Sequence, residues 1–386
     1  MRKLMSLVAI AVASVTVTGL AAAPALADPP TSHGKTITPR NYDIVGVGSD
    51  TDDFLLDQLA ADYDAAHKKV HNKNHPWIYS WDAVPPKNPT DLTSTIVTKQ
   101  GCKAIARPDG SGLGLTAFEG NVKTKGYNCI DFAREASYRS SDPLNKGQNG
   151  DLYVRLAEDA ETYAVNSTTD APANLTPAQL TAIFSCVDTN WNQVGGADAP
   201  IDVVLPASTT GVAKFWLKAL GISSFPTCAT VVQQNEGTAS VFTNATTGPE
   251  AIVPYSVGKY IAQVDHDAKC GKKPTKTQNA FGCDEHGHLL LGKLNLGSAG
   301  IQAATTGTGS KTKINTKLGE TFLRPLYDVV WYATKSTNGD HIPNRLEPFF
   351  ASATSKVKGW FCANSEARQA IVDYGFLTTP LCGFGS

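Results

Sequence analysis

The N-terminal segment constrains this chain most, because it predicts the compartment in which the rest of the chain folds. The segment begins with Arg2 and Lys3, continues with an uncharged apolar run, and ends in Ala-Leu-Ala at 25–27. Small residues at those last positions are what a signal peptidase reads. The pattern predicts a secretory signal peptide over residues 1–27, cleaved before Asp28.

A membrane anchor is the alternative reading of this segment. An anchor needs about 20 strongly apolar residues, whereas this run is diluted by Ser, Thr and Gly. No cysteine stands near the cleavage site to carry a lipid. We therefore expect a secreted, extracellular chain of 386 − 27 = 359 residues that is not tethered to a membrane.

The predicted export favours disulfides for the eight cysteines, since exported proteins form disulfides by default. No C-x-x-C occurs, which argues against a zinc ribbon or a thioredoxin-like site. Eight cysteines allow many connectivities, but they are clustered along the chain, and pairing of neighbours would close four separate loops. Each loop would add a few kcal/mol of stability. The predicted pairs are Cys102 with Cys129, Cys186 with Cys228, Cys270 with Cys283, and Cys362 with Cys382.

Composition narrows the class of protein further. The chain is 41% apolar and 18% charged, which excludes a disordered tail, a coiled coil and a collagen-like chain. Its length fits two or three domains, or one two-lobed protein. Lys and Arg number 34 against 35 Asp and Glu, so the net charge of −1 offers no basic field and we expect no nucleic-acid partner.

The first candidate site follows an apolar segment at 42–48 that predicts a buried strand. Ser49, Asp50 and Thr51 come next, and all three are residue types that cap helices. Apolar residues at helical spacing follow them. A strand, a polar loop and a helix start are where an α/β protein presents backbone N–H groups to an anion. The alternative is an ordinary capped helix.

A glycine-rich turn and an arginine at the end of a predicted strand make the second candidate. Gly110 and Ser111 lie in the turn at 107–114, which does not match the G-x-x-x-x-G-K-[ST] pattern of nucleotide hydrolases. Further on, the segment 129–134 predicts a short strand that ends in Arg134. Surface ion pairing is the alternative for this arginine.

A second strand–loop–helix unit lies far from the first in sequence. The strand predicted at 201–205 is followed by a hydroxyl-rich loop and a helix that ends near Gly221. The loop residues are Ser208, Thr209, Thr210 and Gly211. Alternation of strands and helices along the chain predicts an α/β fold.

The clearest helix signal lies between these two units. Thr176 is placed to cap it, Pro177 stands at its first position, and Gln179 completes a capping box. The pattern predicts a helix over 176–184.

Neither metal binding nor catalysis is expected. His67, His71 and His75 stand four residues apart, but their segment is rich in Lys and Asn and predicts an exposed polar stretch rather than a metal site. No G-x-S-x-G or H-E-x-x-H motif occurs, which favours a binding protein over an enzyme. No cofactor is indicated.

Taken in order, these segments resemble the phosphate-binding proteins that feed bacterial ABC transporters, in particular their secreted actinobacterial relatives. The most specific piece is LTPAQLTAIF, followed by Asn190-Trp191, which is similar to the family's L-T-x-x-Q-L-x-x-I-F…W signature. The resemblance covers nearly the whole chain after the signal peptide. The matching stretches are 45–51, 107–118, 129–134, 173–195, 204–216, 250–263 and 359–383.

The resemblance implies a two-lobed periplasmic-binding-protein fold of type 2, with a ligand held between the lobes and a discontinuous first lobe. The implied divisions are a leader at 28–40, lobe 1 at 41–162 and 261–386, and lobe 2 at 163–260. The implied phosphate ligands are Ser49, Asp50, Thr51, Gly110, Ser111, Arg134, Ser208, Thr209, Thr210 and Gly211. The implied partners are inorganic phosphate or a similar oxyanion and an ABC transporter permease, with the chain itself a monomer.

Two departures from the family pattern weaken the ligand inference. The run S-T-T-G-V stands where the family has S-G-S-G-T, so Val212 removes a hydroxyl donor. Glu135 follows Arg134 where the family has Ser, and a carboxylate beside an anion is unfavourable unless it accepts a proton from that anion. The alternative function is therefore a secreted protein of the same fold that binds another ligand or a cell-surface partner.

Overall fold

The computed structural model describes residues 28, 37–85, 91, 93–120, 122–137, 150–265 and 285–385. The predicted signal peptide, most of the predicted leader at 28–40, and the predicted pair Cys270–Cys283 lie outside the described residues. None of the helices in the described part has the length and apolar character that a bilayer-spanning segment requires.

A mixed sheet of nine strands forms the centre of the described part. Most of its strands are buried along their length, as expected of strands covered on both faces. Its order is β10 (Thr230–Val232), β9 (Asp202–Pro206), β11 (Ala251–Ser256), β8 (Asp151–Asn166), β17 (Leu323–Trp331), β7 (Phe132–Glu135), β1 (Ile44–Gly48) and β2 (Ile78–Ser80), with β12 (Leu289–Leu291) also paired to β8.

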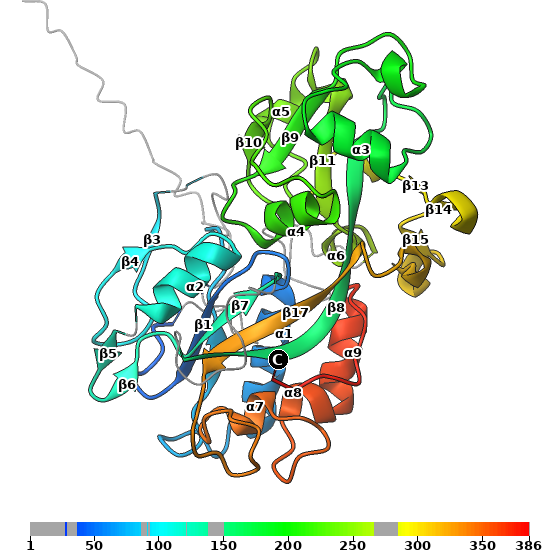
Figure 1. The fold of residues 1–386 in the computed structure, drawn as a ribbon. Helices are drawn as coiled ribbons and strands as arrows, with labels where there is room; N and C mark the ends of the chain where they lie inside the picture. Colours follow the sequence, from blue (N-terminus) through cyan, green and yellow to red (C-terminus); the bar gives the residue numbers. More distant parts are fainter. Residues whose placement is uncertain are drawn as a thin grey trace, which may run out of the picture.

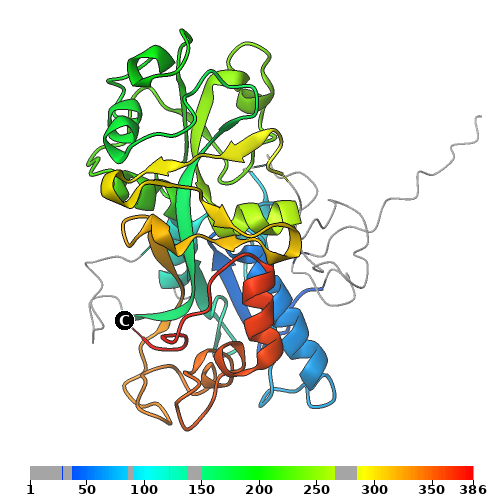
Figure 2. The same ribbon diagram turned by 90° about the vertical axis from the view of Figure 1, so that its right-hand side faces the viewer.

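Helices pack around this sheet in two groups (Figure 1). One group holds α1 (Asp53–His67), α2 (Ser111–Glu119), α7 (Glu347–Phe350), α8 (Trp360–Ala363) and α9 (Ser365–Asp373). The other holds α3 (Pro177–Phe184), α4 (Gly211–Ala219), α5 (Ser240–Thr243) and α6 (Val257–Asp265). Figure 2 shows α1 and α9 side by side, although the chain places them at opposite ends.

Short hairpins lie outside the central sheet, beside both groups of helices. Each pairs two antiparallel strands of two residues. They are β3 (Thr95–Ile96) with β4 (Ile105–Ala106), β5 (Lys123–Thr124) with β6 (Tyr127–Asn128), β13 (Leu294–Asn295) with β14 (Ile301–Gln302), and β15 (Thr305–Thr306) with β16 (Lys313–Ile314).

Two long antiparallel strands, β8 and β17, connect the two halves of the molecule (Figure 1). β8 has 16 residues and β17 has nine. Their ladder runs from Leu323 opposite Ala160 to Trp331 opposite Asp151, with a register shift between Leu326 and Tyr327. The same sheet therefore passes through both halves.

The apolar core divides in the same way, and we use it to define the lobes. Lobe 1 surrounds the core that contains Leu55, Phe132 and Phe349, together with the helices of the first group. Lobe 2 surrounds the core that contains Leu180 and Trp216. Residues from Leu294 to Phe322 also pack into the lobe 2 core, whereas the predicted boundaries at 163 and 260, which stay a prediction, assign them to lobe 1.

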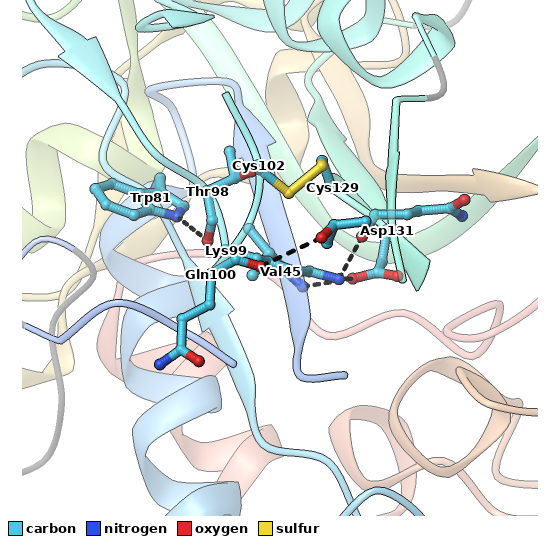
Figure 3. Close-up of a disulfide and its surroundings, with 10 residues drawn as sticks. Val45, Trp81, Thr98, Lys99, Gln100, Cys102, Cys129 and Asp131 are labelled. Carbon is cyan, nitrogen blue, oxygen red and sulfur yellow. Dashed lines mark hydrogen bonds and ion pairs between the residues drawn. A yellow bond between two sulfur atoms is a disulfide. The ribbon is translucent and has the colours of Figure 1, made fainter. Parts of the chain in front are cut away.

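The predicted pairing of neighbouring cysteines is confirmed for three pairs. The disulfides join Cys102 to Cys129, Cys186 to Cys228, and Cys362 to Cys382. Figure 3 shows the first of them, which ties a loop after β3 to the segment leading into β7. Of these three described disulfides, two brace lobe 1 and one braces lobe 2.

Local sequence signals placed several elements correctly. The Thr176 hydroxyl accepts from the Gln179 backbone N–H, and the Gln179 side chain accepts from the Thr176 backbone N–H, so the predicted capping box is confirmed. The strands predicted at 42–48 and 201–205 are observed within one or two residues as β1 and β9. The two strands lead into loops that lie where the lobes meet.

Candidate functional site

The two lobes meet where α2 and α4 begin. The Gly112 backbone N–H donates to the Thr209 carbonyl oxygen across 3.0 Å, which is a direct hydrogen bond between the lobes. Gly110 precedes α2 with a φ of +87°, a conformation that favours glycine, and a Cβ there would lie 3.2 Å from Thr210 Cγ2. The predicted glycine-rich turn and hydroxyl-rich loop therefore face each other.

Ser111 is the centre of this contact. Its side chain is fully buried, and its hydroxyl oxygen accepts a hydrogen bond of 3.1 Å from the Ala136 backbone N–H. A Cβ on Gly211 would lie only 2.6 Å from the Ser111 Oγ and 2.8 Å from the Ala136 Cβ. Glycine at 211 thus allows the start of α4 to approach two separate loops of lobe 1.

The Ser and Thr residues of the hydroxyl-rich loop differ in role: one of them caps α4, and the others are exposed. The Thr210 hydroxyl accepts from the Ala213 backbone N–H at 3.2 Å and donates to the Ala207 carbonyl at 2.9 Å, so it caps α4. Ser208 and Thr209 are exposed. Val212 is fully buried and supplies no donor from its side chain.

A carboxyl group and an amine flank the contact between α2 and α4. Glu135 is fully buried, and its Oε1 accepts from the backbone N–H and the hydroxyl of Ser137. Burial raises the pKa of Glu135, while Lys214 on α4 and the hydroxyls of Ser137 and Ser111 oppose the rise. Lys214 also comes close to Gly112, so this amine extends from lobe 2 to lobe 1.

Arg134 lies below these loops and is fully buried in lobe 1. Its guanidinium donates to the carbonyl oxygens of Ser49 at 2.9 Å and Trp81 at 2.8 Å, and to the hydroxyl of Ser80. The Ser49 backbone N–H in turn donates to the Arg134 carbonyl at 3.1 Å. Arg134 therefore holds together the carboxyl ends of β1 and β2.

The start of α1, with the predicted residues Ser49, Asp50 and Thr51, makes a different set of contacts. The Thr51 hydroxyl accepts from the Gln234 side chain of lobe 2 at 3.0 Å. The ammonium of Lys259, on α6, donates to the Asp50 carbonyl at 2.8 Å and pairs with Asp53 at 2.7 Å. These contacts also join the two lobes.

Arg324 on β17 continues this buried network. Its Nη2 lies 2.9 Å from Asp159 Oδ2 and 3.3 Å from the Thr51 hydroxyl, and its Nη1 lies 2.7 Å from Glu161 Oε2. Burial works against the charge of Arg324, but Glu161 and Asp159 outweigh it and raise its pKa. The pKa of Lys259 is raised in the same way, because Asp50 and Asp53 outweigh the effect of burial.

Further buried carboxyl groups surround Arg134. Burial raises the pKa of Asp52 to about 7, with Arg134 opposing the rise. Asp57 and Asp82 hydrogen-bond to each other, and burial raises the pKa of both. Asp328 on β17 is also buried, with its pKa raised well above the usual range. Burial therefore raises the pKa of several carboxyl groups that lie together near Arg134.

The remaining candidate residues have structural partners. Arg107 pairs with Asp28 and donates to the Asp82 carbonyl at 2.9 Å. His71 bonds to Asp43 at 2.9 Å and stacks on Trp77, so it is less exposed than the polar sequence around it predicts. Among the described residues, no cluster of His, Cys, Asp or Glu is arranged to hold a metal ion.

A family model for a PBP superfamily domain matches residues 29–308. The chain belongs to the PBP superfamily. Its mixed α/β periplasmic-binding-protein fold was predicted correctly from the sequence. No curated protein matches the chain.

Two solved structures illustrate the PBP fold. A phosphate transport receptor of ABC type from Vibrio cholerae is 18% identical, covers 87% of this chain and 100% of its own, and has a TM-score of 0.50. A phosphate ABC transporter substrate-binding protein with bound phosphate, from Clostridium perfringens, is 13% identical, covers 87% and 99%, and has a TM-score of 0.51. At these identities the likeness establishes the fold.

The PBP fold brings most of the predicted residues to one junction, but in two layers. Gly110, Ser111, Thr209, Thr210 and Gly211 lie at the contact between α2 and α4. Ser49 and Arg134 lie beneath it, Asp50 and Thr51 belong to the ion-pair network, and Ser208 is exposed.

Sequence reasoning missed the roles of Lys259, Gln234, Arg324 and Asp328. A usable signal exists only for Arg324 and Asp328, which are two charges four residues apart in an otherwise apolar strand. Residues four apart in a strand share one face, and a buried strand rarely carries unpaired charges there.

Proposed function

We propose that this chain is a secreted solute-binding protein that captures phosphate, or a similar small oxyanion, between its lobes for delivery to an ABC transporter. The observation that carries the proposal is the meeting of two helix starts, one from each lobe, at Ser111 and Gly211. Backbone N–H groups at helix starts favour anions. The solved relative with bound phosphate and the ordered resemblance to secreted phosphate-binding proteins support it.

The proposed capture uses local donors rather than a positive surface. Lobe opening would break the Gly112–Thr209 hydrogen bond and let an oxyanion take the N–H groups of both loops. The Ser111 hydroxyl would add a donor, the Thr210 hydroxyl would add another by releasing the Ala207 carbonyl, and Lys214 would add positive charge from lobe 2. Arg134 would act from behind, by holding the Ser49 loop in place.

Glu135 gives the proposed site a means of choosing among oxyanions. An ionised Glu135 would accept the proton of monoprotonated phosphate, which sulfate lacks. We expect Glu135→Gln to bring phosphate and sulfate responses closer together, because the amide both donates and accepts. Tighter preference for phosphate in this variant would contradict that role.

Thermal and chemical unfolding with and without phosphate tests the proposal directly. About 1 mM phosphate over a site with a dissociation constant of about 1 μM adds about 4 kcal/mol to the free energy of unfolding. The measurement uses the chain without its predicted signal peptide. Absence of a shift with phosphate, arsenate and sulfate would sink the proposal.

A pair of hydroxyl variants locates the effect. Ser111→Ala is expected to reduce the phosphate-dependent gain, whereas Thr176→Ala removes a helix cap in lobe 2 without touching the junction. Both variants lose some stability. Only the first is expected to lose part of the response to phosphate, and an equal loss in both would argue against the site.

The second candidate function is a secreted protein of the same fold that binds another ligand or a cell-surface partner. The buried Val212 favours it, since this side chain offers no hydroxyl at a position where the phosphate-binding relatives have one. Failure of every oxyanion in the unfolding test would favour this function.

A further inference from the structure

A cavity lies within lobe 1, away from the contact between α2 and α4. Its volume is about 340 Å³, within the range of about 300–1,000 Å³ that is usual for small-molecule sites. It shares no residue with the loops proposed to hold an oxyanion. Its lining includes Tyr127, Asp131, Trp331 and Arg345, with Lys123 also at its wall.

A buried cluster with more positive than negative charge forms the floor of this cavity. Asp131 Oδ2 accepts from the Lys99 ammonium and from the Val45 backbone N–H (Figure 3). Its Oδ1 lies 3.1 Å from Arg345 Nη1. One carboxylate thus serves two cations, and the exposed Lys123 adds a third cation to the cavity wall. A bound anion would balance the excess positive charge of these three cations over the single carboxylate.

Two residues of the cavity wall, Arg345 and Trp331, carry buried N–H groups that the described residues leave without partners. Arg345 Nε and Nη2 are buried atoms with no hydrogen-bond acceptor among the described residues, and so is Trp331 Nε1. Buried donors without acceptors destabilise a folded chain, so natural structures rarely keep them. A ligand oxygen would satisfy them, and Nε with Nη2 form the edge of a guanidinium that binds carboxylates in a bidentate manner.

Aromatic groups give the cavity flat walls. The guanidinium carbon of Arg345 lies 5.0 Å from the centre of the Tyr127 ring. Trp331 stacks on Phe118 with ring centres 4.5 Å apart, which fixes the plane of its indole. The Arg345 side chain keeps 27% of its surface exposed, and a ligand would reach its buried Nε and Nη2 once this side chain turns its unpaired edge toward the cavity.

We propose that this cavity binds a small carboxylate attached to a flat apolar group, with its two oxygens on Nε and Nη2 of Arg345. The apolar group lies against Tyr127 and Trp331, and Lys123 supplies charge at the entrance. The carboxylate belongs either to a free organic acid or to the C-terminus of a peptide. This site is separate from the proposed oxyanion site and does not depend on it.

Titration with benzoate, followed by NMR of the indole N–H groups, tests the proposal on the chain without its predicted signal peptide. Trp331→Phe assigns the Trp331 resonance by removing it. We expect benzoate to shift that resonance saturably, with a dissociation constant of about 1 mM or tighter, since affinities near this value are usual for small, few-contact ligands. Benzamide, which lacks the charge, is expected to leave the resonance in place.

Two arms separate the sources of the carboxylate and exclude a general effect of anions. A short peptide that ends in Phe is compared with its C-terminal amide, and binding of the free acid alone supports a peptide source. Binding of benzoate without the peptide supports a free organic acid. Phosphate is expected to leave the Trp331 resonance unmoved, and a phosphate shift equal to that of benzoate would overturn the proposal.

Arg345→Gln is the decisive variant, and Arg368→Gln is its control, because Arg368 is an exposed arginine that does not line this cavity. Loss of the guanidinium edge is expected to weaken benzoate binding at least about tenfold. Should Arg345→Gln fail to fold, calorimetric titration of Trp331→Phe replaces it, with weaker binding expected from the lost indole donor. No saturable response to benzoate up to about ten times the expected dissociation constant, or full binding in these variants, would refute the proposal.

Discussion

The starts of α1 and α4 have the same sequence plan but different surroundings. Both follow a buried strand and a loop rich in hydroxyl groups. At α1, the loop is held by Lys259, Gln234 and Arg324, which come from distant parts of the chain. At α4, the Thr210 hydroxyl turns back on its own helix, and a backbone hydrogen bond from Gly112 to Thr209 joins this loop to the other lobe.

The difference teaches that one motif can serve two purposes within a molecule. The charges at α1 already have protein partners of opposite sign, so this junction is built as a permanent connection. The contact at α4 is mostly neutral and rests on small residues, so it can separate at lower cost. Each experiment below tests whether the first junction is structural and the second is able to open.

Removing Arg324 is expected to have the largest effect. Arg324→Met leaves Asp159 and Glu161 buried beside each other without their cation. Breaking one partner of a buried ion pair costs about 3–5 kcal/mol, which urea unfolding would measure. Lys317→Met removes an exposed cation and serves as control. A loss below about 1 kcal/mol, the scale of an exposed pair, would show that the α1 junction is not the rigid connection.

The pH dependence of stability comes next. Burial raises the pKa of Asp52 from 3.8 to about 7, so the folded chain keeps a proton that the unfolded chain releases. Its contribution to stability is complete below pH 3.8 and is lost as the pH rises through 7. Asp52→Asn is expected to flatten the decline in unfolding free energy between these values by up to about 1.4 kcal/mol per pH unit.

The matching control for Asp52→Asn is Glu320→Gln, at an exposed carboxyl group. Denaturant unfolding at several pH values between 4 and 7 gives the slopes of both variants. Equal slopes for wild type and Asp52→Asn would mean that Asp52 is already ionised in the folded chain.

A methyl group at the second junction tests whether it opens. In Gly211→Ala the new Cβ meets the Ser111 Oγ and the Ala136 Cβ at distances too short for contact. We expect the lobes to be pushed apart at a cost of about 1–3 kcal/mol, typical of overpacking. Small-angle scattering would report a larger radius of gyration. Gly120→Ala, where a Cβ meets nothing closer than 3.3 Å, is expected to keep the compact dimensions.

Ser208 is expected to give the smallest effect. It is exposed, so Ser208→Ala should change stability by less than about 0.5 kcal/mol. The informative readout is the response to phosphate in the unfolding experiment. A reduced response would mean that Ser208 turns into the site when the lobes hold a ligand, while an unchanged response would restrict the site to Ser111 and Thr210.

Local structure was predictable from this sequence where its cause is local. Thr176, Pro177 and Gln179 define a helix start within four residues, and the structure has the capping box they predict. Neighbouring cysteines predicted the three described disulfides for a related reason, since short loops limit the choice of partner. The fold class followed from the order of such segments and from the family they resemble.

Contacts between distant segments were not predictable in the same way. Arg134 was expected at the ligand, yet its donors serve the ends of β1 and β2, which depends on how two strands lie side by side. Arg324 reaches Thr51 across 273 positions of sequence. No spacing rule identifies such a pair, because the sheet order that joins them is set by the whole fold.

The continuity of β8 and β17 through both lobes has a mechanical consequence. A pair of lobes joined by slack segments can swing freely, whereas here the connection is a hydrogen-bonded ladder with a register shift at Leu326 and Tyr327. Separating the lobes must bend this ladder elastically. The ladder is expected to bend most easily at the register shift. The stored bending energy would return the lobes toward each other, so the stiffness of two strands would set how long the molecule stays open.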